Sequence, residues 1–301
     1  MQKNQCGILN SSYNLSKYNI SKLYDNSTKT IVVNSDASST GMAAHAMHEN
    51  QQRIAFRQFL QEEQEKSSVW RELKTIEYSL ESLKSILIKQ KILWKTDNYA
   101  VSKIVNVGSR KNDLQIIAEN IFYICRKNRI DLTVNWVPRE HLGFADTLSR
   151  MIDHDDWQVK EELYNNLNQL WGPFTVDRFA DNDNKKICRF YSKFYCPNTE
   201  GVNALNYDWK GENNYIVPPT SLVGKVLKHM ETSKCKGVIV IPYWPSAYFW
   251  PLLFSENKTA NTDRKVFGDP KVCVTQGKNK KCFIGSEKFV SPILAVNLDF
   301  S

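Results

Sequence analysis

The sequence predicts an α/β protein with two units: a five-stranded mixed sheet with helices on both faces, and a smaller α/β unit after it. Two observations predict the larger unit. Between residues 30 and 152, three strands are followed by helix, strand, helix, helix, strand and helix, an order typical of a mixed sheet. Two of these strands also lead directly into an aspartate. A third observation, a strand followed by Pro-Pro, a helix and another strand within 173–255, predicts the second unit.

The first three strands are predicted as a meander. The stretch 29–38 (KTIVVNSDAS) contains three consecutive β-branched residues, which are typical of a buried strand. Asp36 lies where this strand emerges, and a carboxylate there is unfavourable unless it is solvated, paired or bound to a metal. Two further strands are expected near 42–47 and 53–59, with 48–52 as the turn between them.

A helix is predicted next, over 67–87. Its apolar stripe consists of Leu73, Ile76, Leu80, Leu83 and Leu87. Glu72 lies four positions before Ile76, which places this acid at the edge of the buried stripe and not on the opposite, solvent-facing side.

An acid follows an apolar strand a second time at 92–94, which leads into Thr96-Asp97-Asn98. The first unit is then completed by four elements. These are a short helix to about residue 105, a helix that begins with a capping box formed by Asn112 and Gln115, a strand at 132–137, and a last helix from Ala145 to near Met151.

Composition and charge limit the class of protein. The 301 residues are 42% hydrophobic and 24% charged, which allows one large core or two modest ones. The formal charge of +8 is compatible with a polyanionic partner. No apolar run approaches the ~18 residues that cross a bilayer, and the first ten residues lack a signal-peptide core. The seven cysteines contain no CxxC pair. We therefore expect an intracellular protein, cytoplasmic or nuclear, with no membrane partner and no secretion.

Four acids stand in similar settings: Asp36, Glu72, Asp97 and Asp146. If they converge to ~4 Å, each pair of charges repels by roughly 4 kcal/mol at an effective dielectric of about 20. Such a group persists only if it is protonated or holds cations. Oxygen ligands suit Mg²⁺ or Mn²⁺, and two such ions can support an in-line phosphodiester displacement.

Each acid also has an ordinary interpretation when it is taken alone. Asp36 and Asp97 fit turns after strands, Asp146 fits a helix N-cap, and Glu72 fits a charge on a helix surface. The set of four on these elements favours the metal interpretation.

The motifs that surround these acids resemble one family. SDAS followed by Gly41, then WREL, TDN and WVPREHLGFADTLSR, resembles the RNase H domain of retroelement reverse transcriptases over about 30–152. The DIRS type is the nearest match and the gypsy type the next. The resemblance implies an RNase H-like fold in which Asp36, Glu72, Asp97 and Asp146 bind two Mg²⁺ ions and cleave the RNA strand of an RNA–DNA hybrid.

Hybrid recognition in such a protein depends on groove shape and 2′-hydroxyl groups more than on base sequence. Ser38, Asn98 and Ser109 are candidate substrate-binding residues. Integrases and transposases share the fold and the metal chemistry, but their acids usually run Asp, Asp, Glu. Here Glu72 comes second, which favours RNase H.

The second unit resembles the region downstream of RNase H in the DIRS-type polyprotein. After a helical connector at 153–172, the layout of 173–255 also resembles Dam-type DNA adenine methyltransferases, in which a strand ends in Asp/Asn-Pro-Pro-Tyr. Here the loop is Val217-Pro218-Pro219-Thr220. Valine cannot accept the hydrogen bond of the target amine and threonine cannot stack on a base, so we expect a non-catalytic, degenerate domain. Candidate pocket residues are Asp177, Phe179, Asn182 and Asn184.

Three segments remain. Residues 1–29 are expected to be an N-terminal tail, and 256–301 a basic, partly disordered tail that adds affinity for phosphates. The segment 244–251 (WPSAYFWP) either stacks on single strands or packs in the core.

The leading hypothesis for the chain is a retroelement-derived ribonuclease H that acts on RNA–DNA hybrids, with a reverse transcriptase polymerase domain on another chain as a further partner. The alternative is a catalytically inactive nucleic-acid-binding fragment of a retrotransposon polyprotein.

Overall fold

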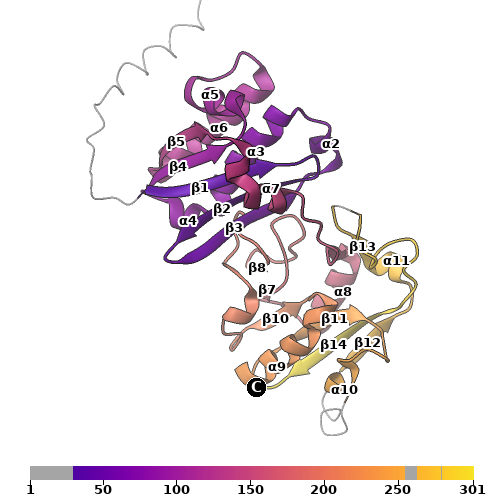
Figure 1. Ribbon diagram of the computed structural model, residues 1–301. Helices are drawn as coiled ribbons and strands as arrows, with labels where there is room; N and C mark the ends of the chain where they lie inside the picture. The colour runs from indigo at the N-terminus through magenta and orange to yellow at the C-terminus, as the bar shows by residue number, and fades with distance from the viewer. Residues whose placement is uncertain (1–29, 255–262, 279) are drawn as a thin grey trace, which may run out of the picture.

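The computed structural model describes residues 30–254, 263–278 and 280–301, and the predicted N-terminal tail lies outside them. We call 30–152 the first unit and 153–301 the second unit (Figure 1). The first unit contains a mixed sheet in the order β3-β2-β1-β4-β5. Its strands are β1 (Thr30–Ala37), β2 (Gly41–His48), β3 (Gln51–Gln58), β4 (Lys91–Thr96) and β5 (Asp131–Trp136). The first three strands are antiparallel neighbours, whereas β1, β4 and β5 run parallel. The predicted five-stranded mixed sheet is therefore confirmed.

Helices cover this sheet on both sides. They are α2 (Gln61–Gln64), α3 (Ser68–Ser82), α4 (Lys84–Leu87), α5 (Tyr99–Val107), α6 (Asn112–Asn128), the 3₁₀ turn η1 (Arg139–Leu142) and α7 (Gly143–Ser149). One face of the sheet packs its apolar residues, such as Val33 and Ala44, with those of α3 and α6 in one core. The other face carries Asp36 and His45 and contacts α7, where Phe144 packs edge-on against His45.

Two details of the helices differ from the prediction. The helix expected over 67–87 is interrupted at Leu83, where the backbone leaves helical geometry between α3 and α4. The capping box of Asn112 and Gln115 is wrong, because Lys111 is the N-cap residue of α6. The Gln115 side chain instead accepts the Ser109 N–H at 2.7 Å, since the preceding loop folds back over it.

The second unit contains another five-stranded sheet, in the order β12-β14-β11-β10-β7. Its strands are β7 (Val176–Asp177), β10 (Asn213–Ile216), β11 (Lys236–Pro242), β12 (Arg264–Phe267) and β14 (Ile293–Asp299). The predicted helical stripe lies on α9 (Val223–Ser233) between β10 and β11 and packs in a core with residues of β11 and β14. Smaller elements are β8 (Tyr191–Ser192), β9 (Gly201–Val202), η2 (Ala204–Asn206), η3 (Thr220–Leu222) and α10 (Trp250–Leu253).

Two predictions about the second unit are wrong. The connector is not purely helical, because β6 (Trp157–Val159) precedes α8 (Glu161–Trp171), and both contribute to a core of the second unit. The described part of the expected tail is folded. It forms β12, α11 (Pro270–Cys273), β13 (Val274–Gln276) and β14, and β13 pairs with β6. The buried residues of this region include Cys273, Val274 and the run 293–296, which lie among the described lysines in the sequence.

The aromatic segment 244–251 serves mainly as core. Phe249 is fully buried with α9, whereas Tyr248 is 60% exposed and its hydroxyl donates to the carbonyls of Thr220 and Ser221. In the described part of the chain, no helix has the length and apolar character that a membrane crossing requires.

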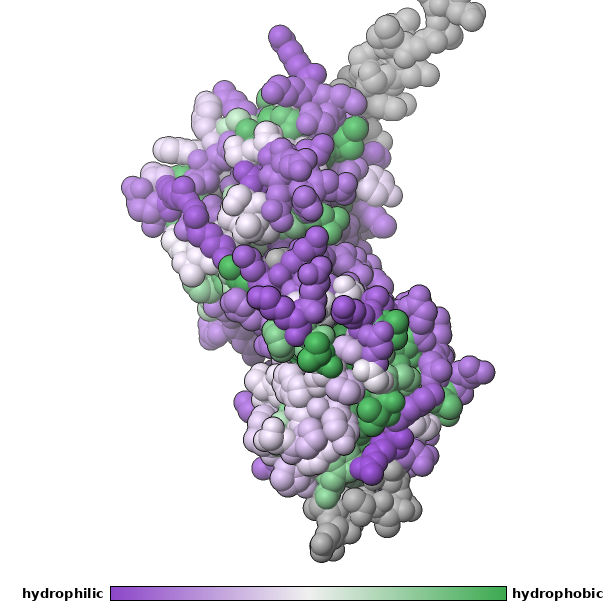
Figure 2. Space-filling view, turned by 90° about the vertical axis from the view of Figure 1, so that its right-hand side faces the viewer, coloured by the Kyte–Doolittle hydropathy of each residue, from purple (hydrophilic) through white to green (hydrophobic). Residues whose placement is uncertain are grey.

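The two units are in contact along β3, an edge strand of the first sheet. The Tyr195 N–H donates to the Ile54 carbonyl at 2.9 Å, and Arg53 donates to the Tyr195 hydroxyl at 2.6 Å. Arg57 forms ion pairs both with Glu63 in its own unit and with Asp183 in the second unit. Figure 2 shows the two lobes from the side, with hydrophilic residues over most of the visible face of the first unit.

Candidate metal centre

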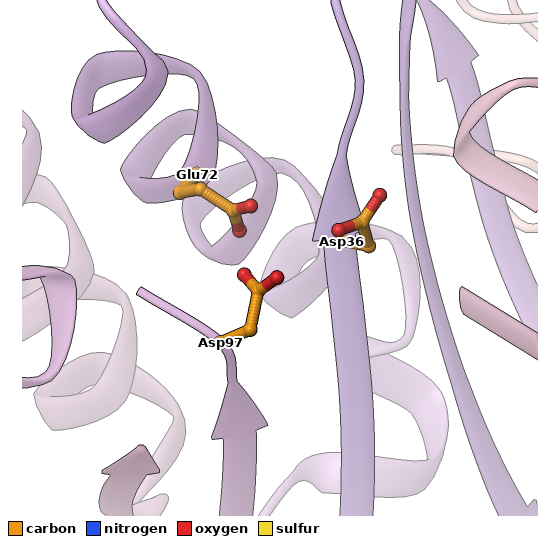
Figure 3. Close-up of side chains that lie close together, drawn as sticks. All are labelled: Asp36, Glu72 and Asp97. Carbon is orange, nitrogen blue, oxygen red and sulfur yellow. The ribbon is translucent and has the colours of Figure 1, made fainter. Parts of the chain in front are cut away.

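Three of the four predicted acids meet at one edge of the first sheet. Asp36 lies near the end of β1, Asp97 directly follows β4, and Glu72 projects from α3 (Figure 3). One carboxylate oxygen of each lies within 4.8 Å of those of the other two. We call Asp36, Glu72 and Asp97 the acid triad.

The local structure explains this convergence. Because β1 and β4 are parallel neighbours, their carboxyl ends lie at the same edge of the sheet. Ser67 is the N-cap residue of α3, the helix that carries Glu72, and its side chain accepts the Trp70 N–H. The apolar stripe of α3 fixes the orientation of the helix on the sheet. The Ala37 N–H then donates to Glu72 Oε1 at 3.2 Å, which connects α3 to the end of β1.

The surroundings of the triad disfavour the ionised form of two of its carboxyl groups, those of Asp36 and Glu72. Burial, followed by the charges of Asp36 and Asp97, holds the pKa of Glu72 well above its usual value. Burial also raises the pKa of Asp36, although a hydrogen bond from Ser149 opposes this effect. Glu72 Oε2 is buried without a hydrogen-bond partner. A buried, all-oxygen set with an unsatisfied acceptor fits a divalent cation such as Mg²⁺ or Mn²⁺.

Asp146, the fourth predicted acid, lies outside the triad. Its carboxylate accepts hydrogen bonds from Arg150 and from Arg139, and these bonds lower its pKa. It remains within electrostatic reach of the triad, since its charge is one of the influences that raise the pKa of Asp36. The structure thus brings three acids together and pairs the fourth with two arginines at the rim.

Two further residues support the triad, and neither of them is among the site residues predicted from the sequence. The Ser149 hydroxyl, at the end of α7, donates to Asp36 Oδ2 at 2.5 Å. The Trp136 indole N–H donates to the Asp97 carbonyl at 2.9 Å, and the ring is half exposed. The only advance signal for Ser149 is its spacing of three residues after Asp146 on a short helix.

Of the predicted substrate-binding residues, Ser38 and Asn98 lie in the loops that follow β1 and β4, next to the triad, and Ser109 lies in the loop between α5 and α6. The Ser38 hydroxyl accepts the N–H groups of Thr40 and Gly41 and donates to the Ser149 carbonyl at 2.7 Å. Asn98 caps α5 through its side-chain oxygen, and the Ser109 hydroxyl accepts the Lys111 N–H. Their contact with a substrate stays a prediction.

A cavity of about 530 Å³ lies in the second unit beyond the carboxyl ends of β7 and β10. Of the candidate pocket residues, Phe179 and Asn184 line it, and Asp177 lines a much smaller space beside it. The Asn182 side chain is bound by Lys185 at 2.7 Å. Val217 and Pro219, from the loop after β10, also line the large cavity.

Two family models match different parts of the chain. The RNase H-like domain found in reverse transcriptase matches residues 26–121, and the DNA N-6-adenine-methyltransferase (Dam) matches residues 147–257. A protein of Escherichia coli (strain K12) named as a methyltransferase, YfdM, is 36% identical over 55 residues, which are 18% of this chain and 53% of that protein. The chain therefore matches about half the length of this relative.

Several solved structures resemble the first unit at low identity. RNase H1 from Halobacterium salinarum NRC-1 is 14% identical with a TM-score of 0.33, over 40% of this chain and 94% of that one. LC11-RNase H1, isolated from compost by a metagenomic approach and solved with an RNA/DNA hybrid, is 16% identical with a TM-score of 0.31. The match covers 39% of this chain and 92% of that one. The foamy viral protease-reverse transcriptase, also solved with an RNA/DNA hybrid, is 14% identical with a TM-score of 0.29. The match covers 40% of this chain and 19% of that one.

The sheet order of the first unit agrees with the first of these family models. The chain contains an RNase H-like domain, followed by a Dam-like domain.

Proposed function

We propose that this chain is a ribonuclease H of a DIRS-type retroelement, which cleaves the RNA strand of RNA–DNA hybrids and depends on Mg²⁺ or Mn²⁺. The acid triad is the observation that carries this proposal. Carboxylates from three separate elements converge within 4.8 Å, and one of them keeps a buried, unsatisfied oxygen. The mutual repulsion of these carboxylates is unfavourable, and a bound divalent cation would offset it.

The residues of the chain take defined roles in this proposal. Asp36, Glu72 and Asp97 hold the first cation, Asp146 contributes to a second, and Ser149 fixes the orientation of Asp36. When bound, the cations supply charge neutralisation and Lewis-acid activation of the phosphodiester, and cleavage leaves a 3′-hydroxyl and a 5′-phosphate. Ser38, Asn98 and Ser109 contact the backbone of the hybrid or its 2′-hydroxyl groups.

The retroelement origin is supported by the neighbouring matches to an RNase H-like domain found in reverse transcriptase and to a Dam-like domain. A reverse transcriptase polymerase domain on another chain would supply the hybrid. The second unit is proposed to be non-catalytic, because the loop after β10 offers Val217 and Thr220 where a methyltransferase needs a hydrogen-bond acceptor and an aromatic ring.

Cleavage of a labelled RNA–DNA hybrid by the purified chain in Mg²⁺ tests the proposal. Asp97→Asn is expected to lower the rate by at least about 100-fold, equivalent to about 3 kcal/mol of transition-state stabilisation, while hybrid binding in EDTA is retained. Asp113→Asn removes an exposed acid in the first turn of α6 and should leave cleavage unchanged. Hybrid binding without any cleavage by the wild-type chain would favour the alternative, a catalytically inactive nucleic-acid-binding fragment.

A further inference from the structure

Arg139 and Arg150 form a clamp on Asp146. Arg150 donates through Nε to Oδ2 at 3.1 Å and through Nη2 to Oδ1 at 3.0 Å. Arg139 donates through Nη2 to Oδ1 as well. Two guanidinium groups therefore occupy both carboxylate oxygens of Asp146, and this accounts for the absence of Asp146 from the acid triad.

The clamp is accessible and lies beside the triad. The side chains of Arg139 and Arg150 are 59% and 57% exposed. Asp36 is within electrostatic reach of both guanidinium groups, and Asp97 is within reach of Arg139. Exposed ion pairs of this kind contribute little net free energy, so another anion can displace the carboxylate. The planar guanidinium fork that fits a carboxylate also fits a phosphate.

We infer that Arg139 and Arg150 are phosphate-binding residues for the RNA–DNA hybrid, and that in the free chain Asp146 occupies them in place of a phosphate. The inference rests on the proposed function. When the hybrid backbone takes over the two guanidinium groups, the Asp146 carboxylate is released. It can then serve as a ligand of a second cation, so the fourth acid joins the centre only when nucleic acid is bound.

The number of Mn²⁺ ions bound by the full chain tests the first half of this inference. We expect electron paramagnetic resonance titration to count one tightly bound ion per free wild-type chain, and two when Arg139→Gln and Arg150→Gln are combined. Arg189→Gln is the matched control, because Arg189 is also exposed and paired with two carboxylates, Glu200 and Glu212 in the second unit. A double variant that still binds one ion overturns the release of Asp146.

Binding of a labelled hybrid in EDTA, where nothing is cleaved, tests the second half. Loss of each arginine should reduce the slope of log affinity against log salt by roughly 1, as expected for one phosphate contact. Asp146→Asn should tighten binding, and by more than Glu140→Gln, which removes an exposed negative charge from the neighbouring turn η1. An unchanged slope, or equal effects of the two charge removals, overturns the phosphate contact.

The outcomes separate this inference from the proposed function. If the wild-type chain binds no Mn²⁺ and cleaves nothing, the proposed function fails and this inference fails with it. If the wild-type chain binds one ion and cleaves, but the double variant gains none, only the inference fails. Because both arginines are exposed, we expect the variants to keep the wild-type melting temperature, and a circular dichroism melt checks this.

Discussion

Ser149 connects the last helix of the first unit to the acid triad through one hydrogen bond. Its hydroxyl donates to Asp36 Oδ2, and this bond lowers the pKa of Asp36 against the effect of burial. Groups that orient a metal ligand in this way commonly contribute a factor of about 10–100 to metal affinity.

Ser149→Ala should therefore weaken Mn²⁺ binding by about 10-fold or more, because the carboxylate loses its orientation and its pKa rises further. Isothermal titration calorimetry measures this change. The control is Ser82→Ala, which removes a buried helical hydroxyl that donates to the Tyr78 carbonyl. Equal losses in the two variants would mean that Ser149 acts only through stability.

Asp177 should make the second unit sensitive to pH. Burial raises its pKa to about 6, although the N–H groups of Lys186 and Phe179 both donate to it. Between pH 4 and 6 the folded state thus binds more protons than the unfolded state, so stability falls as the pH rises through this window. The difference between the ordinary pKa of 3.8 and the raised value of about 6 corresponds to a decrease of about 3 kcal/mol in the free energy of unfolding above pH 6.

Denaturant unfolding in EDTA at several pH values checks this expectation. Asp177→Asn should lack the decrease between pH 4 and 6 that the wild-type chain shows. The acid triad contributes the same pH dependence to the free energy of unfolding of both proteins, so this contribution cancels when the variant is compared with the wild type. Parallel curves for the two proteins would contradict the assignment.

At the scale of single residues, the sequence predicts the acids but not their partners. Asp36 and Asp97 were predictable because each comes at or after the end of an apolar strand, and Glu72 because it borders an apolar stripe. The contacts of Ser149, Trp136 and the two arginines depend on how α7 and β5 pack in three dimensions. This packing cannot be predicted from the spacing of apolar residues in the sequence.

At the scale of elements, the position of α7 depends on a close approach to β2. A Cβ atom added to Gly41 would lie 2.7 Å from the Ser149 carbonyl oxygen, so any side chain there forces the helix away from the strand. Gly143, at the start of the same helix, has open space around its missing Cβ.

Gly41→Ala should consequently lower the free energy of unfolding by about 1–3 kcal/mol and weaken Mn²⁺ binding, because Ser149 moves away from Asp36. Gly143→Ala should be neutral or stabilise by up to about 1 kcal/mol, since alanine favours helix. Chemical denaturation and metal titration of both variants provide the comparison. A Gly41→Ala protein with wild-type stability would show that α7 can shift freely.

Elements with strong periodicity were predictable, and short ones were not. The strands and long helices of the first unit fall close to their predicted positions because each has an apolar run or stripe. β6 has three residues and β12 has four, which is too short for a pattern to emerge above the surrounding charges. β14 was predictable, because the run from Ile293 to Val296 is apolar, yet the lysine-rich composition before it obscured this signal.

At the scale of the whole molecule, the contact along β3 should make the two units unfold together. Tyr195 lies against the core of the first unit, pairs with the edge strand and accepts a hydrogen bond from Arg53. Edge strands that are paired in this way are also protected from association with other chains.

Tyr195→Ala should cost about 2 kcal/mol and split a single thermal transition into two, because the packing of the Tyr195 ring and its hydrogen bond from Arg53 are lost between the units. Differential scanning calorimetry measures the transitions. Tyr123→Ala, on the exposed side of α6, is the control for loss of a tyrosine. A single transition in both variants would indicate that other contacts are sufficient.

The place of β14 between β11 and β12 has a consequence for synthesis on the ribosome. The first unit can fold as soon as its own residues emerge, because all five of its strands come from a continuous stretch. The second sheet cannot, because β11 and β12 share no backbone pairing until residues 293–299 have been translated. A nascent chain interrupted before that point would carry a folded first unit and a second sheet with an unpaired edge at β11, which makes it a target for chaperones.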